Sequence, residues 1–478
     1  MKNDLQRVLD GLDVQIPEMM QQWGVAGLSV AIVKDGKVVL TKGYGFRDVQ
    51  EKLPVTENTV MPIGSTTKSF TSLILSMLEE EGKLDWDKPV KEYIPWLKLS
   101  DPIVTEQVTA RDLLCHRTGL PKFDVHGVFC TKDDRKEMVE DLQYLSMSAP
   151  FRTQLQYSNQ MVMLGGYLAE VLTGKSWEDL VKERILEPLG MGSTCATIAE
   201  LESYEDRSKG YVFTGTDNME VPYLTLRGIG PAGAMNSNAS DMAQYLLMQL
   251  GQGTKLVTEK SLEEMHKVQM NGTPYFWSMD EITEANYGLG WFVDTYRGHK
   301  MVSHGGNTLG FSSLMTLMPE EDFGLILLTN GNSNFMINAL TYTILDKLLG
   351  VEVPDWTAKM QGLIGGVFGQ MQAAMEARAK ARTPETQPRL SLDAYCGAYQ
   401  APGFGTFTIN ENNGALMGDL NGYAAMFNHY HYEEFDTLIM LMGVNFPITF
   451  QYGEDGSVEG FAAMLEPTVA PVVFKKIS

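Results

Sequence analysis

The sequence lacks the features that point to several common classes of protein. Of its 478 residues only four are cysteines, and no two of them form a Cys-x-x-Cys pair: Cys115, Cys130, Cys195 and Cys396. This spacing argues against a zinc site or a redox dithiol, so we expect no metal and no other cofactor. No run approaches the roughly 18 apolar residues that a membrane helix needs, and the first residues lack the apolar core of a signal peptide. We therefore expect reduced thiols, a cytoplasmic location and no membrane partner.

Basic residues are also scarce. The chain has 38 Lys and Arg against 60 Asp and Glu, which gives a formal net charge of -22. A surface this acidic argues against nucleic acid as a partner. Hydrophobic residues make up 44% and charged residues 21%, which is typical of a globular protein with a large core. The length favours two domains, or one large domain with a small one.

Strand patterns lie at both ends of the first 350 residues, and helical patterns lie between them. The β-rich runs 27–33 and 38–42 flank Asp35-Gly36 and predict a hairpin. Apolar periodicity predicts helices over 5–22, 66–80, 161–172 and 239–250, and short strands over 288–293, 300–303, 311–317 and 323–329. We expect an α/β (α+β) domain over residues 1–349. Its antiparallel sheet would be built from both ends of the segment and flanked by helices.

The remaining residues change character twice. An apolar stripe between Met360 and Met375 predicts a helix in a linker that covers residues 350–390. Such a stripe could bind a partner, but it more often packs on its own domain, which we favour here. From residue 391 to 478, short β runs separated by turns predict a small antiparallel β domain, either a barrel or a sandwich.

One short motif opens the helix over 66–80. Ser65 and Lys68 are three residues apart, so both side chains face the same way and can hydrogen-bond. The positive end of the helix favours negative charge on the serine oxygen. Burial of the lysine would disfavour its charged form, so that it could act as a neutral base. On its own the motif is weak, because about one chance match is expected in a chain of this length.

Two further segments raise its significance. Tyr157-Ser158-Asn159 directly precedes the predicted helix over 161–172, and His304-Gly305-Gly306 lies on a strand pattern. Paired glycines in a strand indicate a close approach to the backbone. Taken singly, the tyrosine and the histidine have ordinary structural explanations. No Gly-x-Ser-x-Gly elbow, His-Glu-x-x-His motif or phosphate-binding loop is present.

In this order, Ser-x-x-Lys, Tyr-x-Asn and His-x-Gly resemble the motifs of the penicillin-recognising serine hydrolases. That family includes class C β-lactamases, D,D-peptidases, D-aminopeptidases and related esterases. Segments 43–48, 113–121 and 231–237 also look like landmarks of the family, and the resemblance covers about residues 10 to 345. It implies a β-lactamase-like fold. The segment from Tyr395 to Tyr399 resembles the lipocalin-like domain appended to some of these peptidases.

The resemblance also implies a set of site residues. Catalytic roles fall on Ser65, Lys68, Tyr157 and His304, and substrate-binding positions on Asn159, Gly305, Gly306 and Asn307. Ser65 would be the nucleophile, and the proton transfer would be shared by Lys68 and Tyr157, with the acylation base left open. The oxyanion hole would use the backbone N–H groups of Ser65 and Asn307.

We expect different roles for the two histidines in these segments. His304 stands where β-lactamases usually carry lysine, which weakens a fixed positive charge for a β-lactam carboxylate. His116 lies in one of the family landmarks, and we interpret it as structural.

These observations predict a serine hydrolase that cleaves amide bonds, peptide-like and including those of D-amino acids, through a Ser65 acyl-enzyme. One alternative is a promiscuous carboxylesterase or weak β-lactamase, and another is a non-catalytic binding protein on the same fold. The partners would be small peptide, amide or ester substrates, and a homo-oligomer stays open. Four aromatic residues either line an apolar pocket or pack in loops: Phe123, Phe129, Tyr211 and Tyr223.

Overall fold

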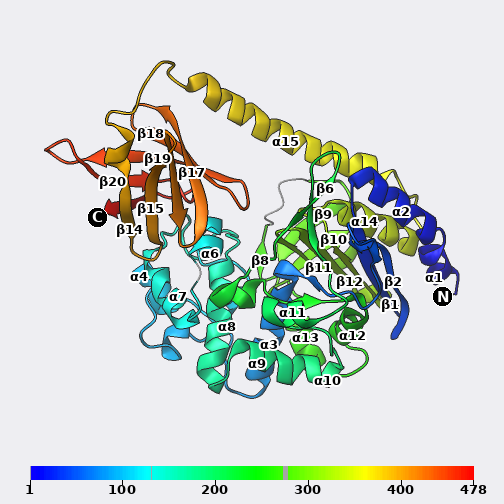
Figure 1. Ribbon diagram of the computed structural model, residues 1–478. Coiled ribbons are helices and arrows are strands. Elements are labelled where there is room, and N and C mark those ends of the chain that lie inside the picture. The colour runs from blue at the N-terminus through cyan, green and yellow to red at the C-terminus, as the bar shows by residue number, and fades with distance from the viewer. Residues whose placement is uncertain (1, 131, 273–277) are drawn as a thin grey trace.

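A large antiparallel sheet organises the first part of the chain (Figure 1). The computed structural model describes residues 2–130, 132–272 and 278–478. Nine strands of these residues follow one another across the sheet in this order: β3 (Leu53–Pro54), β2 (Lys37–Asp48), β1 (Gly27–Lys34), β13 (Phe323–Thr329), β12 (Phe311–Met318), β11 (His299–Thr308), β10 (Phe292–Tyr296), β9 (Ile282–Tyr287) and β8 (Met270–Asn271). The two ends of the segment meet where β1 pairs antiparallel with β13, from Leu28 opposite Thr329 to Lys34 opposite Phe323. The predicted sheet, built from both ends, is confirmed.

Local turn chemistry accounts for the first hairpin and for two differences from the sequence predictions. Asp35 and Gly36 have φ values of 50° and 73° between β1 and β2, and two positive values are what a tight two-residue hairpin turn requires. The helix predicted over 5–22 is instead two helices, α1 (Lys2–Leu9) and α2 (Leu12–Trp23), which separate at Gly11. The strand predicted over 288–293 begins only at Phe292, the first residue of β10, because the N–H of Gly288 donates to the carbonyl of Trp291 at 2.7 Å and closes the turn from β9 to β10.

Helices cover both faces of the sheet, so its central strands are apolar on both sides. In β1, Val30 and Ile32 pack in one core with α2 and α14 (Met336–Leu349). Ala31 and Val33 face the opposite core, which contains α3 (Lys68–Glu80), α8 (Asn159–Thr173) and α12 (Ala239–Gln249), because successive side chains of a strand point to opposite faces. Shorter helices surround this second core: α4 (Pro102–Gln107), α5 (Ala110–Leu114), α6 (Asp124–Phe129), α7 (Arg135–Asp141), α9 (Trp177–Val181), α10 (Glu187–Leu189) and α13 (Glu259–Met265). Helix α11 (Ile198–Ser203) packs instead in a small separate cluster through Leu201.

The C-terminal segment is a closed antiparallel barrel, which settles the choice between barrel and sandwich. Each strand pairs with the next, and β14 closes the ring by pairing with β21. The strands are β14 (Gly397–Ala401), β15 (Gly405–Asn412), β16 (Ala415–Leu420), β17 (Tyr423–His431), β18 (Glu434–Ile439), β19 (Val444–Tyr452), β20 (Val458–Ala463) and β21 (Val472–Lys476). Aromatic rings pack together in this segment, with Phe461 5.0 Å from both Tyr399 and Phe474 between centroids. Small barrels are filled by inward side chains in this way.

A long helix, α15 (Trp356–Ala381), runs from the sheet domain to the barrel (Figure 1). Its first turns pack through Trp356, Met360 and Ile364, as predicted, but Phe368, Met371 and Met375 are 59%, 57% and 69% exposed. The packing prediction therefore holds only for the first part of the stripe. The division of the chain at residues 349 and 390 stays a prediction. Among the described residues, none of the helices has the length and apolar character to cross a membrane.

Candidate active site

Ser65 lies in a tight turn that leads into α3. The turn is a 3-10 helix, η1 (Gly64–Thr67), and α3 follows without interruption. Gly64 has a φ of 50°, and a Cβ on it would lie 2.7 Å from the backbone nitrogen of Asn307. A glycine at this point therefore lets the turn approach strand β11. Ser65 is half-buried, whereas Lys68 on the next turn is buried completely.

Lys68 contacts three oxygen atoms, two of which come from distant parts of the chain. Its Nζ lies 2.9 Å from Ser65 Oγ, 2.7 Å from Asn159 Oδ1 and 2.7 Å from the carbonyl oxygen of Ala232. The predicted contact between Ser65 and Lys68 is thus present. Asn159 begins α8, and Ala232 ends the 3-10 helix η5 (Arg227–Ala232). These elements direct the lysine nitrogen at the serine oxygen.

The surroundings of Lys68 disfavour its charged form. Burial holds the pKa of the ammonium well below its ordinary value, the charge of Lys122 lowers it further, and Asp124 opposes these effects. A lowered pKa favours the neutral amine over the ammonium. A neutral amine has two N–H groups, which match Asn159 and Ala232, and one lone pair for the hydroxyl of Ser65.

Tyr157 packs against Lys68. The lysine Nζ is 4.9 Å from the centroid of the tyrosine ring. Burial raises the pKa of the phenol above its ordinary value, and a hydrogen bond with Ser65 opposes this rise. Tyr157 is therefore a neutral donor over the physiological range. The structure brings the tyrosine, the lysine and the serine together, as the motif order predicts.

His116 supports the segment that carries Tyr157. Its Nδ1 accepts a hydrogen bond from the backbone N–H of Ser158 at 3.2 Å, and its carbonyl oxygen accepts one from Gln156 at 2.7 Å. Its ring packs between Tyr157 and Tyr287, at 4.3 and 4.8 Å between centroids. These contacts agree with the structural interpretation of this histidine.

His304 is held as a neutral ring. Its Nδ1 lies 2.6 Å from the carbonyl oxygen of Gly305, which can only accept, so this nitrogen carries the proton. Nε2 is then an acceptor, and the hydroxyl of Tyr287 donates to it at 2.9 Å. Burial lowers the pKa of His304 to about 3, and the nearby Lys68 acts in the same direction. The position therefore carries no fixed positive charge. A catalytic role for His304 stays a prediction.

The two glycines after His304 differ in the space around them. A Cβ on Gly306 would overlap the carbonyl oxygen of Ile63 and lie 2.8 Å from the backbone nitrogen of Ser65. A Cβ on Gly305 would have its nearest neighbour at 3.5 Å. The close approach expected from the paired glycines thus occurs at Gly306. Asn307 follows, and its Oδ1 accepts from Ser312 Oγ at 2.8 Å, so its side chain is engaged within the sheet.

Two groups at the site were missed from the sequence. Tyr287 orients the His304 ring, but no pattern in the sequence distinguishes this tyrosine from other aromatic residues near the end of a strand. The carbonyl of Ala232 binds Lys68, and a signal for it existed, because Ala232 lies in the segment 231–237 that looked like a family landmark. Every residue has a backbone carbonyl, so the type of residue at position 232 does not indicate that its carbonyl binds Lys68.

The four aromatic residues considered for a pocket are all packed against protein. Phe123 and Phe129 contact Phe404 and Tyr423 of the C-terminal segment. The Tyr211 hydroxyl accepts from the backbone N–H of Val49. The remaining residue, Tyr223, donates to the carbonyl of Ser208 and stacks on Phe311. Of the two alternatives for these four residues, an apolar pocket or packing within loops, the contacts support packing.

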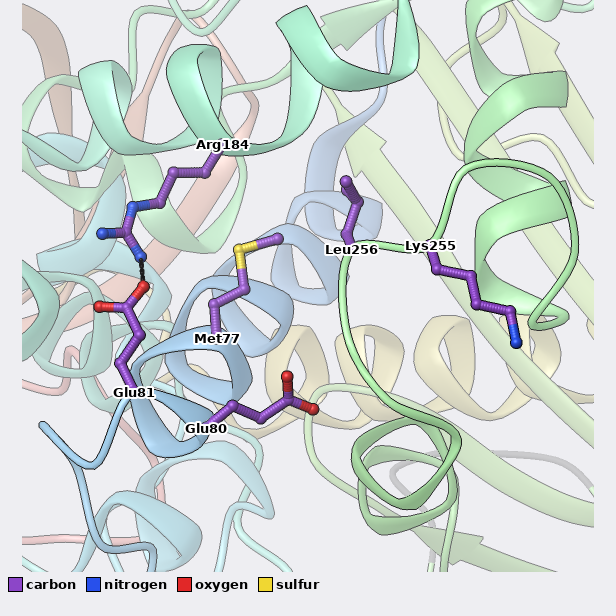
Figure 2. A pocket seen from close by; sticks show the side chains of 6 residues that line it. All are labelled: Met77, Glu80, Glu81, Arg184, Lys255 and Leu256. Atoms are coloured by element: carbon purple, nitrogen blue, oxygen red, sulfur yellow. Dashed lines mark hydrogen bonds and ion pairs between the residues drawn. The ribbon is translucent and has the colours of Figure 1, made fainter.

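A surface hollow lies at the far end of α3 from this site. Figure 2 shows its lining, in which Arg184 pairs with Glu81 at 2.5 Å beside Met77 and Leu256. Met77 lies nine positions after Lys68 along α3, or about 14 Å at the usual rise. We assign this hollow no part in the chemistry.

Comparison with known proteins decides the family. The profile of the beta-lactamase family matches residues 12–348, most of the chain. The chain belongs to the beta-lactamase family. The C-terminal residues 381–476 match a domain of unknown function, DUF3471. A curated relative of this family member is the unguisins hydrolase ungD' of Aspergillus campestris, 29% identical over 96% of this chain and 91% of its own length.

Several solved structures are also similar to this chain. The octameric penicillin-binding protein homologue of Pyrococcus abyssi is 24% identical, with a TM-score of 0.63 over 97% of this chain and 99% of its own, and shares its fold. The D-amino acid amidase of Ochrobactrum anthropi is 26% identical, with a TM-score of 0.60 over 73% of this chain and 97% of its own. This beta-lactamase family member is a serine hydrolase with a β-lactamase-like fold and a C-terminal barrel.

Proposed function

We propose that this serine hydrolase cleaves amide bonds of small peptide-like substrates, including those of D-amino acids, through an acyl-enzyme on Ser65. The observation that carries the proposal is the set of three acceptors around Lys68 Nζ: Ser65 Oγ, Asn159 Oδ1 and the carbonyl of Ala232. Intact machinery of this kind argues against a non-catalytic binding protein.

The arrangement favours Lys68 as the base for acylation. The neutral lysine accepts the proton of Ser65 while Ser65 Oγ forms a bond to the substrate carbonyl carbon. Tyr157, which burial keeps protonated, then donates its proton to the leaving nitrogen as the C–N bond breaks. The lysine returns its proton to the tyrosine. Water attacks the ester carbon in the second half, and the same groups carry its protons in the reverse order.

The backbone near Ser65 suits the charge that develops on the substrate oxygen. Gly306 brings β11 against the Ser65 nitrogen, so the N–H groups of Ser65 and Asn307 belong to neighbouring segments. In our proposal these two N–H groups form the oxyanion hole, and the substrate binds along the segment of β11 that contains Gly305 and Gly306.

The preference for amides over lactams is supported by His304. Its ring is neutral and both nitrogens have protein partners, so this position does not supply the fixed cation that would hold a β-lactam carboxylate. The likeness to a D-amino acid amidase points in the same direction. A carboxylesterase or weak β-lactamase is the alternative within the same chemistry.

A substrate panel on one preparation tests the proposal. D- and L-amino acid amides, short p-nitrophenyl esters and nitrocefin are compared, with Ser65→Ala as the blank. We expect amide turnover that Ser65→Ala abolishes, together with labelling of Ser65 by a fluorophosphonate. A clear preference for the esters would favour the alternative, and full activity of Ser65→Ala would refute the mechanism.

A further inference from the structure

The C-terminal barrel packs on α6, a short helix beside the active site. The Phe404 ring lies 6.2 Å from that of Phe123 and 5.4 Å from that of His126, between centroids. Tyr423 packs edge-on against Phe129 at 4.8 Å. Because these rings are buried in the same core as the barrel interior and the catalytic helices, the barrel and α6 form one packed unit (Figure 1).

Two polar contacts fix the register of this interface. Glu466 Oε2 accepts from the backbone N–H of Phe123 at 3.2 Å, and Asn421 Nδ2 donates to the carbonyl of Phe129 at 3.1 Å. Glu466 is buried, and its other oxygen accepts from both the N–H and the hydroxyl of Thr468. The carboxylate is thus anchored in the barrel. It holds Phe123 at a φ of 43°, a strained conformation for a residue with a side chain.

From α6, contacts continue to the two elements that hold Lys68. The carbonyl of Phe123 accepts from Gln160 Nε2 at 3.0 Å, and Gln160 directly follows Asn159 in α8. Gly127 packs closely here, because a Cβ on it would lie 3.2 Å from Gln160 Nε2 and 3.2 Å from Ile229 Cδ1. Ile229 belongs to η5. Since α8 and η5 supply two of the three acceptors around Lys68 Nζ, Asn159 Oδ1 and the carbonyl of Ala232, α6 supports both of these elements.

The residues on either side of Phe123 also act on Lys68 through their charges. Lys122 and Asp124 form an ion pair at 2.8 Å. Lys122 lowers the pKa of Lys68, and Asp124 raises it by a smaller amount. A shift of this turn would therefore change the protonation of the lysine as well as its position.

We propose that the C-terminal barrel is a positioning element of the catalytic site, and that Glu466 is the positioning residue that couples it to Lys68 through the turn at Phe123. This inference rests on the role of Lys68 proposed above. The barrel would then be required for acylation at full rate although none of its residues is assigned to the chemistry.

The test compares Glu466→Ala with Glu466→Gln in the full chain. The measurement is the second-order rate of fluorophosphonate labelling of Ser65 as a function of pH, with the unfolding midpoint as a check of folding. We expect Glu466→Ala to label about tenfold more slowly, since even small misplacement of catalytic groups is costly. The acid limb of its profile should move to higher pH, because the lost effect of Lys122 exceeds that of Asp124. Glu466→Gln retains an acceptor for Phe123 but places an amide donor against the N–H of Thr468, so its rate should lie between those of the wild type and Glu466→Ala.

Two further variants complete the design. Glu411→Ala changes an exposed glutamate on β15 and should leave the rate and the profile unchanged. Asn421→Asp keeps the size of an exposed turn residue but replaces the amide that donates to the carbonyls of Phe129 and Phe404, and should slow labelling about threefold. This variant carries the test if Glu466→Ala does not fold.

The proposal is overturned if folded Glu466→Ala, or Asn421→Asp in its place, labels at the wild-type rate with the wild-type profile. It is also overturned if Glu466→Gln is as slow as Glu466→Ala. Failure of the proposed function is recognised separately, since the wild type would then not be labelled, or Ser65→Ala would still be labelled.

Discussion

The two glycines of β11 offer a matched pair in which one methyl group tests the geometry of the site. A Cβ on Gly306 would overlap the carbonyl oxygen of Ile63 and lie 2.7 Å from Ser313 Oγ and 2.8 Å from the backbone nitrogen of Ser65. A Cβ on Gly305 would lie 3.5 Å from its nearest neighbour, an ordinary contact. Neither glycine has a positive φ, so space alone distinguishes the two positions.

Relief of the overlap at Gly306 requires β11 and the Ser65 turn to separate by about 1 Å, a displacement that can cost about 100-fold in rate. We therefore expect Gly306→Ala to lose about 100-fold in amide or ester turnover, and Gly305→Ala to stay within about threefold of the wild type. Overpacking would also cost Gly306→Ala about 1–3 kcal/mol of its free energy of unfolding.

The assay is initial-rate turnover, together with fluorophosphonate labelling, at a temperature where urea titration shows both variants to be folded. Equal rates for the two alanine variants would refute the steric argument. So would a larger loss for Gly305→Ala, because the distances predict the opposite order.

Three further predictions address other parts of the structure. Lys68→Arg should lower the rate of fluorophosphonate labelling about 10²–10⁴-fold, because arginine stays protonated and cannot act as a general base. In the wild type, kcat/KM should rise with pH as Lys68 loses its proton, with a midpoint well below the ordinary lysine pKa. Tyr287→Phe should lower the free energy of unfolding by about 1–3 kcal/mol in urea titrations, since it leaves buried His304 Nε2 without its donor. Asp346→Ala should cost about 3–5 kcal/mol in the same assay without slowing labelling of the folded enzyme, because the carboxylate of this buried residue joins the Arg297 guanidinium to the Trp356 indole N–H.

The sequence alone was sufficient wherever structure depends on near neighbours. Ser65 and Lys68 are three residues apart on a helical segment, so their contact follows from helix geometry. The β1–β2 hairpin follows from Asp35-Gly36, since both residues tolerate the positive φ that the turn needs. The continuity of the helix over 5–22 and the start of the strand over 288–293 were predicted wrongly, because apolar periodicity does not register a break at Gly11 or a turn closed by Gly288.

The site beyond Ser65 and Lys68 was predicted from the order of motifs, not from their geometry. The acceptors of Lys68 lie 91 and 164 residues away along the chain, at Asn159 and Ala232. No local pattern specifies such an approach, because it depends on how α8 and η5 pack against α3. Only the structure shows that Tyr287 fixes the His304 ring in a neutral form.

The role of the C-terminal barrel could not be read from the sequence at all. Alternating apolar residues predict strands, but they do not indicate which surface of a barrel meets another domain. Glu466 and Phe123 are 343 residues apart, and their hydrogen bond exists because the aromatic contacts of Phe404 and Tyr423 set the barrel on α6. The sequence by itself predicted most of the elements through periodicity and turn residues, and it placed Ser65 beside Lys68 through short-range helix geometry. The tertiary structure alone decided which distant carbonyls, rings and carboxylates surround them, because packing of side chains far apart in the chain determines those contacts.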